Sequence, residues 1–295
     1  MKSPIAGAVK RCRVADGAQF RLKDHDPADT CGIDLDADAA RDLLADDVAR
    51  LASLQARLYA DNRWSLLCIF QAMDAAGKDG TIKHVMSGVN PQGVQVTSFK
   101  APGPEALAHD FLQRCVLALP ERGRIGIFNR SHYEEVLVVR VHPEILEREH
   151  LPRELLGKKL WAHRMDAIVA FERHLSLQGT LILKFFLHVS KAEQKRRFLE
   201  RLEEKDKHWK FSASDLTERG FWDDYQHAYQ EAIAATAAPE APWFIVPADN
   251  KWFTRIIVVE AMIEALEALD LRIPAPTEAE EAALEAARRK LESEA

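Results

Sequence analysis

The stretch "AMDAAGKDG", from Ala72 to Gly80, carries the residue types of a phosphate-binding loop. The usual pattern is Gly, four residues, then Gly-Lys followed by Ser or Thr. Gly77-Lys78 is intact, but Ala72 stands at the first glycine position and Asp79 at the hydroxyl position. The lysine can bridge phosphate oxygens, whereas the missing hydroxyl is the group that normally contacts magnesium. The loop therefore predicts phosphate binding with an unusual set of metal ligands.

Two carboxylates lie beside this lysine, those of Asp74 and Asp79. A carboxylate next to bound phosphate is repulsive unless a cation lies between them, and Mg²⁺ takes carboxylates together with phosphate oxygens. Asp74 is therefore predicted to be a magnesium ligand. For Asp79 two interpretations stay open: a metal ligand, or an acid in the first turn of a helix, where the helix dipole favours negative charge.

A second polar segment, "NRSHYEE", follows the apolar run at residues 124–128. In P-loop enzymes an aspartate often follows such a strand and helps to hold magnesium. Here that position is occupied by Asn129, and Arg130 comes next. Ligands of open α/β sheets collect at the carboxyl ends of strands, so Arg130 is predicted to clamp a phosphate with its forked guanidinium group. An ordinary surface ion pair is the alternative.

These residues need strands and helices to position them, and the apolar pattern supplies both. Short apolar runs predict strands, which are expected at residues 64–70, 94–99, 124–128, 180–189 and 243–248. Helical spacing is found at residues 35–59, 152–178 and 250–271. Strands that alternate with helices indicate an α/β fold, a parallel sheet covered by helices on both faces. Residues 134–142 suit either a strand or a helix.

We expect three parts along the chain. Residues 1–60 form an N-terminal segment that is irregular up to residue 30 and then helical. Residues 61–272 form the core that carries the phosphate-binding loop, and this core includes a lid at about residues 190–220. Residues 273–295 form a charged tail, rich in Ala, Glu and Arg, that reads as a solvated helix.

Composition excludes several classes of protein. The chain has 295 residues and a net charge of −6, which argues against a general nucleic-acid binder but allows a local basic groove for an anionic substrate. The four cysteines form no CxxC pair, so neither a zinc site nor a disulfide framework is expected. No signal-peptide pattern and no apolar run of ~18 residues are evident. We expect a cytoplasmic protein that binds neither membranes nor nucleic acid.

Four motifs together resemble the family-2 polyphosphate kinases: "MDAAGKDGTIK", "GVNPQGV", "FNRSHYEEV" and "KWFTR". The resemblance extends from about Phe20 to about Leu271, and the motifs look most like the class III subgroup, which uses nucleoside mono- and diphosphates. It implies a thymidylate-kinase-like P-loop fold with a helical lid, a Mg²⁺ cofactor and a homo-oligomer, dimer or tetramer. It also implies that inorganic polyphosphate, rather than ATP, is the donor and that purine nucleotides are the acceptors.

The resemblance also assigns roles to individual residues. Catalytic roles are predicted for Asp74 and Lys78 in Walker A, Arg130 in Walker B, and Arg197 and Arg201 in the lid helix. Phosphate or nucleotide binding is predicted for Ala75, Ala76, Gly77, Lys78, Asp79, Gly80, Asn129, His132 and Tyr133.

Two positions depart from the family pattern. Other branches carry aspartate where Asn129 stands and an aromatic residue where His132 stands. An amide is a weaker magnesium ligand than a carboxylate, so Glu134 is expected to supply the missing charge, and the predicted metal ligands are Asp74, Glu134 and Asn129. His132 is expected to pack or to touch a base rather than to act as a general base.

The segment from Ser190 to Lys210 is predicted to be a mobile lid helix. Ser190 followed by Glu193 reads as a capping box at its start. Phe198 and Leu202 give one apolar side, while Arg197 and Arg201 lie four residues apart on a neighbouring side and are predicted to reach the transferred phosphoryl group. A solvated helix with internal arginine–glutamate pairs is the alternative.

Two other functions compete with polyphosphate:nucleotide phosphotransfer. An ATP-dependent nucleoside monophosphate kinase would share the loop, but it usually has the hydroxyl that Asp79 replaces. A non-catalytic sensor of nucleotide or polyphosphate would keep the loop as a binding module.

Overall fold

The computed structural model describes residues 4–210 and 213–294, so residues 211 and 212 of the predicted lid lie outside the described residues. Six strands form one sheet in the order β1-β6-β5-β2-β4-β3. The strands are β1 (Arg13–Val14), β2 (Ser65–Ala72), β3 (Val94–Ser98), β4 (Ile125–Asn129), β5 (Thr180–His188) and β6 (Trp243–Pro247). All neighbours pair in parallel except β1, which is antiparallel to β6. The predicted parallel α/β fold is confirmed.

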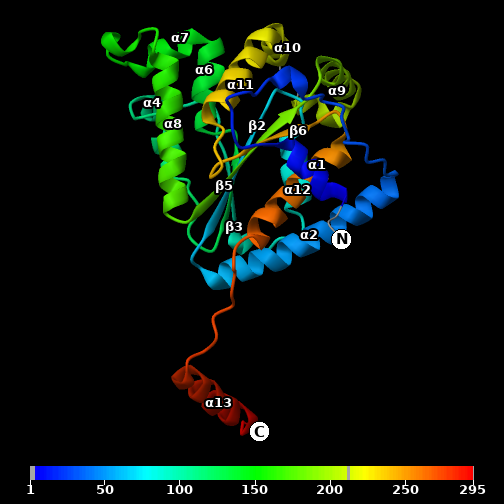
Figure 1. The fold of residues 1–295 in the computed structure, drawn as a ribbon, viewed down its shortest axis with the longest axis vertical. Coiled ribbons are helices and arrows are strands. Elements are labelled where there is room, and N and C mark those ends of the chain that lie inside the picture. The colour runs from blue at the N-terminus through cyan, green and yellow to red at the C-terminus, as the bar shows by residue number, and fades with distance from the viewer. Residues whose placement is uncertain (1–3, 211–212, 295) are drawn as a thin grey trace.

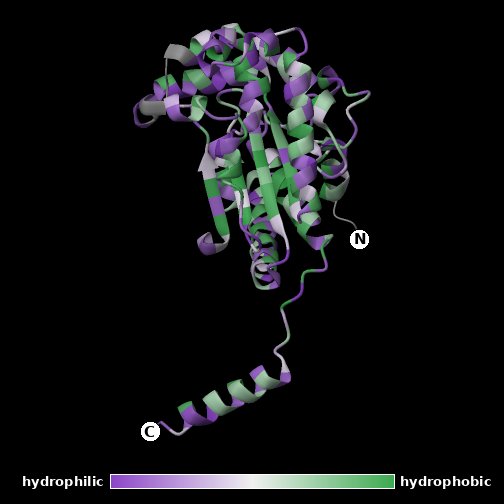
Figure 2. Ribbon diagram, turned by 90° about the vertical axis from the view of Figure 1, so that its left-hand side faces the viewer, coloured by the Kyte–Doolittle hydropathy of each residue, from purple (hydrophilic) through white to green (hydrophobic). Residues whose placement is uncertain are grey.

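Strand β2 lies inside the sheet, and its residues 66–70 are all apolar. Every residue of β2 is buried, because β4 and β5 flank its edges and helices cover both faces. Figure 2 shows the central strands in green among the surrounding helices. Phe70 of β2 is level with Asn129 of β4 and Phe185 of β5. The carboxyl ends of these strands therefore meet at one edge.

Helices form a layer on each face of the sheet (Figure 1). The first layer holds α1 (Pro4–Cys12), α2 (Ala37–Asp61), α3 (Lys78–Val85) and α12 (Lys251–Glu267), which pack on one another. The second holds α6 (Val138–Val141), α8 (Leu160–Leu177) and α11 (Trp222–Thr236). The remaining helices are α4 (Pro104–Leu107), α5 (Gln113–Val116), α7 (Pro143–Leu146), α9 (Lys191–Glu203), α10 (Ala213–Gly220) and α13 (Glu278–Glu292).

The N-terminal segment was predicted to be irregular up to residue 30, and this is wrong for its first part. Helix α1 buries Ile5, Ala8, Val9 and Cys12, which recur at helical spacing. It packs against α12 and β6, and β1 follows it directly. The helix is short and Gly7 interrupts it, so its stability depends on tertiary packing rather than on local propensity.

Two further expectations are settled by the structure. Residues 134–142, which suited either type of element, are helical: the 3₁₀ helix η3 (His132–Val136) leads into α6. The tail forms α13, which begins with a capping box between Thr277 and Glu280 and extends away from the rest of the molecule (Figure 1). None of the helices in the described ranges is both long and apolar enough to cross a membrane.

Candidate active site

The phosphate loop lies between β2, which ends at Ala72, and α3, which begins at Lys78. Ala75 has φ +61° and Gly77 has φ +104°, so two loop residues adopt the left-handed conformation. Alternation of this kind turns successive N–H groups toward one concavity, which binds anions. Because the helix begins at Lys78, Asp79 lies in its first turn, one of the two positions expected for this carboxylate.

Lys78 lies at the junction of the loop and α3, and its side chain reaches back to the start of the loop. Its Nζ donates to the carbonyl oxygen of Ala72 at 2.9 Å. Burial, together with the nearby positive charge of Arg130, lowers the pKa of Lys78 to about 8, although Asp74 and Glu134 oppose the shift. Bound phosphate would restore the charge, because an anion close to an ammonium group favours its protonated form.

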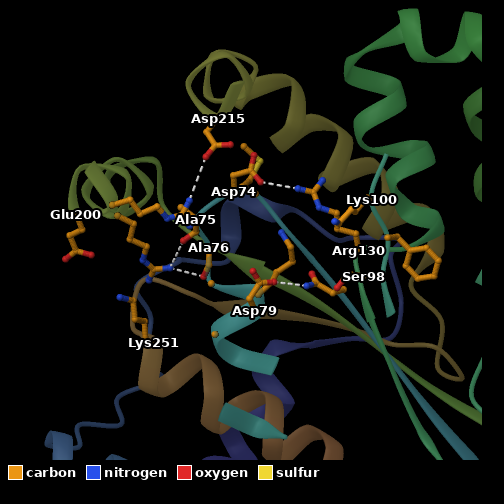
Figure 3. Close-up of a pocket in the computed structure, with 18 of the residues that line it drawn as sticks. Asp74, Ala75, Ala76, Asp79, Ser98, Lys100, Arg130, Glu200, Asp215 and Lys251 are labelled. Atoms are coloured by element: carbon orange, nitrogen blue, oxygen red, sulfur yellow. Dashed lines mark hydrogen bonds and ion pairs between the residues drawn. The ribbon is translucent and has the colours of Figure 1, made fainter. Parts of the chain in front are cut away.

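Arg130 joins two of the predicted metal ligands. Its Nη2 lies 3.2 Å from Asp74 Oδ1, and its Nη1 lies 2.9 Å from Glu134 Oε2. Figure 3 shows Asp74 and Arg130 facing each other across the cleft. Glu134 and then Asp74 raise the pKa of Arg130 further above its usual value, against the effect of burial. The fork that was predicted to clamp phosphate is thus occupied by two carboxylates.

Asn129 and Asp79 form a second pair on the other side of the loop. The Asn129 amide Nδ2 donates to Asp79 Oδ1 at 2.7 Å. Within residues 4–210 and 213–294, no three acidic, histidine or cysteine side chains are grouped as a complete metal site. Mg²⁺ usually takes only one or two protein carboxylates and completes its shell with phosphate oxygens and water. Asp74 and Glu134, which Arg130 brings together, would supply the carboxylates of such a partial site.

Arg197 is buried beneath the loop, with only 5% of its surface exposed. Its Nε donates to Glu193 at 2.7 Å, and its Nη1 donates to the carbonyl oxygens of Ala75 and Ala76 at 3.1 and 2.8 Å. Its Nη2 donates to the carbonyls of residues 248 and 249. Arginine has five N–H donors, and all five are engaged by the protein. The prediction that Arg197 reaches the phosphoryl group does not fit this geometry, in which the side chain supports the loop instead.

Arg201 has a different environment on the same helix. Its Nη1 lies 3.8 Å from Asp215 Oδ2 on α10, and its guanidinium lies 5.5 Å from the centre of the Phe198 ring. Ser190 caps α9 by accepting the N–H of Glu193. Leu202, expected on the apolar side, is exposed. The two arginines that were predicted to act together therefore have different environments. Arg197 is fully engaged by the loop, whereas Arg201 makes a longer contact with Asp215 that a ligand can displace.

These groups line a cleft of about 890 Å³ (Figure 3). Its lining residues are Met73, Asp74, Ala75, Ala76, Gly77, Lys78, Asp79, Gly80, Ser98, Phe99, Lys100, Ala101, Asn129, Arg130, Arg197, Glu200, Arg201, Asp215 and Lys251. The sequence analysis missed two cations, Lys100 and Lys251. Lys100 lies just beyond β3 and Lys251 begins the helix after β6, so the rule that ligands collect at the carboxyl ends of strands points to both.

Two predicted nucleotide-binding residues lie outside the cleft. His132 is 2% exposed and Tyr133 is fully buried, and neither lines the cleft. The His132 ring stands edge-on to Phe171, and the Tyr133 ring stands edge-on to Trp243. For His132 this geometry fits packing, one of the two expected alternatives, and for Tyr133 the burial does not fit the predicted contact with a nucleotide. The sequence placed them near Arg130, but the η3 helix turns both side chains into the core.

Two smaller hollows adjoin the cleft. The first is a slot of about 130 Å³ with apolar walls that include Phe111, Val138 and Ile145, and Lys100 and Arg130 line both the slot and the cleft. The second is an open cleft of about 820 Å³ that shares Lys251 with the first. Its basic side chains are Arg41, His84, Arg196, Lys251 and Arg255. We call these the apolar slot and the basic cleft.

Comparisons with known proteins identify the family of this chain. The family model described as Polyphosphate kinase 2 (PPK2) matches residues 34–274. The chain is 55% identical over 239 residues to the ADP-polyphosphate phosphotransferase of Rhodopseudomonas palustris, a match covering 81% of this chain and 83% of that protein. It is 44% identical over 273 residues to the AMP/ADP-polyphosphate phosphotransferase of Meiothermus ruber, covering 92% and 98%.

A solved structure extends the agreement to three dimensions. The crystal structure of Polyphosphate Kinase 2 from Arthrobacter aurescens TC1 matches with a TM-score of 0.84 at 42% sequence identity, covering 92% of this chain and 95% of that chain. With a family model over most of its length and relatives well above 30% identity, the chain belongs to the polyphosphate kinase 2 family.

Proposed function

We propose that this chain transfers the terminal phosphoryl group of inorganic polyphosphate to purine nucleoside mono- and diphosphates, reversibly and with Mg²⁺. The observation that carries the proposal is the position of Lys78 and Arg130, which lie in a cleft with an apolar slot on one side and a basic cleft on the other. Relatives named ADP- and AMP/ADP-polyphosphate phosphotransferases support this choice of donor and acceptor.

The apolar slot suits the acceptor nucleotide. A purine ring is flat and mostly apolar, and walls formed by Phe111, Val138 and Ile145 would remove it from water. Arg130 borders both hollows, so a base in the slot directs the nucleotide's phosphates toward Arg130 and Lys78. The slot therefore accounts for a nucleotide acceptor on one side of the phosphate loop.

The basic cleft suits the donor. Arg41, Arg196 and Arg255 lie along it, and Lys251 connects it to the main cleft. A polyphosphate chain carries about one charge per phosphate and needs a run of cations rather than a single site. On a protein with a net charge of −6, a localised basic surface concentrates a polyanion without making the whole molecule basic.

The residues of the loop have separate tasks in this mechanism. Lys78 and the loop N–H groups hold the phosphate oxygens, and Arg130 exchanges its carboxylate partners for the transferred group. That exchange frees Asp74 and Glu134 to hold Mg²⁺. The metal would neutralise charge on the phosphate oxygens during transfer. Because the transition state is loose, positioning and charge neutralisation are sufficient and no covalent nucleophile is required.

The predicted lid is part of the same proposal. Gln194 of α9 donates to the Asp74 carbonyl at 2.9 Å, and Arg219 of α10 donates to Gln194 Oε1 at 2.6 Å. These contacts couple both helices to the loop. Closure over bound phosphates would bring Arg201 away from Asp215 and exclude water that would otherwise hydrolyse the donor. Proteolysis with and without polyphosphate tests this closure.

An assay with purified protein and Mg²⁺ distinguishes the three candidate functions. Polyphosphate with ADP or AMP should give ATP or ADP, whereas ATP with AMP should give little product. Efficient turnover of ATP with AMP and none with polyphosphate would favour the ATP-dependent kinase, and binding without turnover would favour the sensor. The proposal includes a homo-oligomer, which light scattering coupled to gel filtration measures.

A further inference from the structure

A network of buried polar groups lies behind the segment that carries Arg130. The Tyr133 hydroxyl lies 2.8 Å from Glu172 Oε1 and 3.1 Å from Lys184 Nζ. Lys184 also donates to Glu172 Oε2 at 2.6 Å and to the Thr236 carbonyl at 2.7 Å. All four residues are at most 2% exposed. We call Tyr133, Glu172, Lys184 and Thr236 the buried tyrosine network.

The network joins four separate elements of the fold. Tyr133 belongs to η3, Glu172 to α8, Lys184 to β5 and Thr236 to α11. All three N–H donors of Lys184 are satisfied, and Trp243 donates its indole N–H to the Thr236 hydroxyl at 2.9 Å. The Tyr133 ring is thereby fixed relative to β5, which is the direct neighbour of the strand that leads into the phosphate loop.

Stability alone does not explain a buried ion pair at this place. Well-packed apolar side chains of similar volume are often as stabilising as a buried lysine–glutamate pair, because both charges must be taken out of water. A fully satisfied polar network instead favours one arrangement of its members. Glu172 and Lys184 line neither the cleft nor the apolar slot, so contact with a ligand does not explain them either.

The segment next to Tyr133 has a backbone that needs such support. Arg130 has φ +63°, a left-handed conformation that residues other than glycine adopt rarely and keep only when their surroundings hold them. Its own N–H donates to the Phe70 carbonyl at 3.0 Å. After it, the Ser131 hydroxyl accepts the Tyr133 N–H at 3.1 Å, and the Gln71 amide contacts the same hydroxyl at 3.1 Å. Both ends of the left-handed turn are therefore anchored.

We propose that the buried tyrosine network is a positioning device for Arg130. The network fixes Tyr133 and thereby one end of the left-handed turn. This backbone turn then sets the direction of the Arg130 guanidinium between Asp74 and Glu134. The inference rests on the proposed role of Arg130 in binding the transferred phosphoryl group. None of the four network residues touches substrate, so their effect on transfer is exerted through Arg130.

Tyr133→Phe tests the inference, because it removes the hydroxyl and keeps the packed ring. The matched control is Ser65→Ala, which removes a buried hydroxyl that bonds to Thr180 at 3.0 Å at the other end of β2, about 20 Å from the loop. Both variants should melt a few degrees below the wild type. Only Tyr133→Phe should lower kcat, by about tenfold, with the KM for nucleotide nearly unchanged. A kcat within twofold of wild type in Tyr133→Phe would overturn the inference.

A second variant avoids dependence on a single hydroxyl. Replacing both members of the ion pair, Glu172→Met with Lys184→Met, leaves no unpaired buried charge, and this double variant should still unfold cooperatively. It should lose turnover at least as strongly as Tyr133→Phe. Full turnover in a folded double variant would show that the network contributes only to packing.

A double-mutant cycle identifies the residue through which the network acts. In an Arg130→Lys background, Tyr133→Phe should cause little further loss of kcat, whereas independent effects would multiply. Multiplicative losses would contradict the inference while leaving the role of Arg130 intact. Wild-type turnover of Arg130→Lys alone would overturn the proposed role of Arg130, and the inference with it, so the two failures are distinguishable.

Discussion

The Nη1 atom of Arg197 lies 2.8 Å from the carbonyl oxygen of Ala76, so a lid-helix arginine holds the backbone of the phosphate loop. The neighbouring carbonyl of Ala75, a residue in the left-handed conformation, accepts from the same nitrogen. A loop whose N–H groups point into the cleft must turn some carbonyls away from it. Arg197 satisfies these carbonyls, which is a structural requirement of the anion site itself.

Arg197→Lys should therefore destabilise the protein even without ligand. A lysine cannot reproduce the fork, and each lost buried charge-assisted hydrogen bond costs about 1.5–3 kcal/mol. We expect the melting temperature of the ligand-free protein to fall by several degrees. Arg201→Lys is the control, since Arg201 has only a loose contact with Asp215 and should change turnover more than stability. An unchanged ligand-free melting temperature in Arg197→Lys would show that this arginine does not support the loop.

Lys78→Ala should abolish most transfer and leave the fold intact. Among the described residues the lysine donates to the Ala72 carbonyl alone, so its loss leaves a small structural defect, but the stretch from Ala72 to Gly80 contains no other cation. Loss of charge stabilisation of this kind costs about 10²–10³ in rate. Circular dichroism checks the fold, and half of the wild-type turnover in a folded variant would contradict the loop's assigned role.

Polyphosphate binding should weaken as the pH rises above about 8. Burial lowers the pKa of Lys78 to about 8 in the ligand-free protein, so the side chain is charged at pH 7 and mostly neutral at pH 9. Since bound phosphate requires the charged form, affinity should fall by up to about tenfold per pH unit in that range. Lys78→Arg should remove the dependence, because arginine stays protonated. Calorimetry at pH 7, 8 and 9 measures the affinity for polyphosphate. An affinity of the wild type that does not change with pH would contradict the prediction.

The Mg²⁺ concentration that the reaction requires should depend on Asp74 and Glu134. Asp74→Asn should raise the Mg²⁺ concentration for half-maximal rate by at least about tenfold, since even outer-shell partners of a metal matter that much. Glu134→Gln should act in the same direction but more mildly. Asn129→Asp supplies the control by adding the carboxylate that Asn129 lacks. If Asn129→Asp increased activity while Glu134→Gln changed nothing, Glu134 would not be compensating.

Stability should depend on pH through a buried carboxyl far from the cleft. Asp47 of α2 is 2% exposed, and burial together with the nearby Glu260 of α12 raises its pKa to about 7. Its unfolded pKa is about 3.9, so the folded state binds an extra proton between these values, and stability falls as the pH rises from about 4 to 7. Asp47→Asn should flatten that slope and be the more stable form at pH 8. Urea unfolding of the wild type and of Asp47→Asn at pH 5 and 8 measures the free energy of unfolding. An equal change with pH in both proteins would exclude this role of Asp47.

The parallel sheet and the phosphate loop could be predicted because both depend on local patterns. Residues 66–70 form an apolar run, as is typical of a strand between two others, and Gly77-Lys78 marks the turn that follows the strand. Arg130 and Asp74 were identified for the same reason, since strand ends locate ligands. Helix α1 was missed because nine residues with a central glycine have little helical preference without tertiary contacts.

The direction of a side chain and its hydrogen-bond partners could not be predicted from the spacing of residues along the sequence. His132 and Tyr133 lie within three residues of Arg130, yet the left-handed turn at Arg130 and the η3 helix after it direct both side chains into the core. The spacing of Arg197 and Arg201 placed both near the cleft, as the structure does, but it carried no information about which carbonyls would engage Arg197.

The most direct test of the proposed phosphoryl transfer is phosphorus NMR of purified protein with Mg²⁺, polyphosphate and ADP, in the absence of ATP. We expect the γ-phosphate signal of ATP to appear as the polyphosphate signal declines, and Lys78→Ala to slow this transfer by about 10²–10³. No ATP from the wild-type protein with either ADP or AMP as acceptor, or ATP formed equally fast by Lys78→Ala, would contradict it.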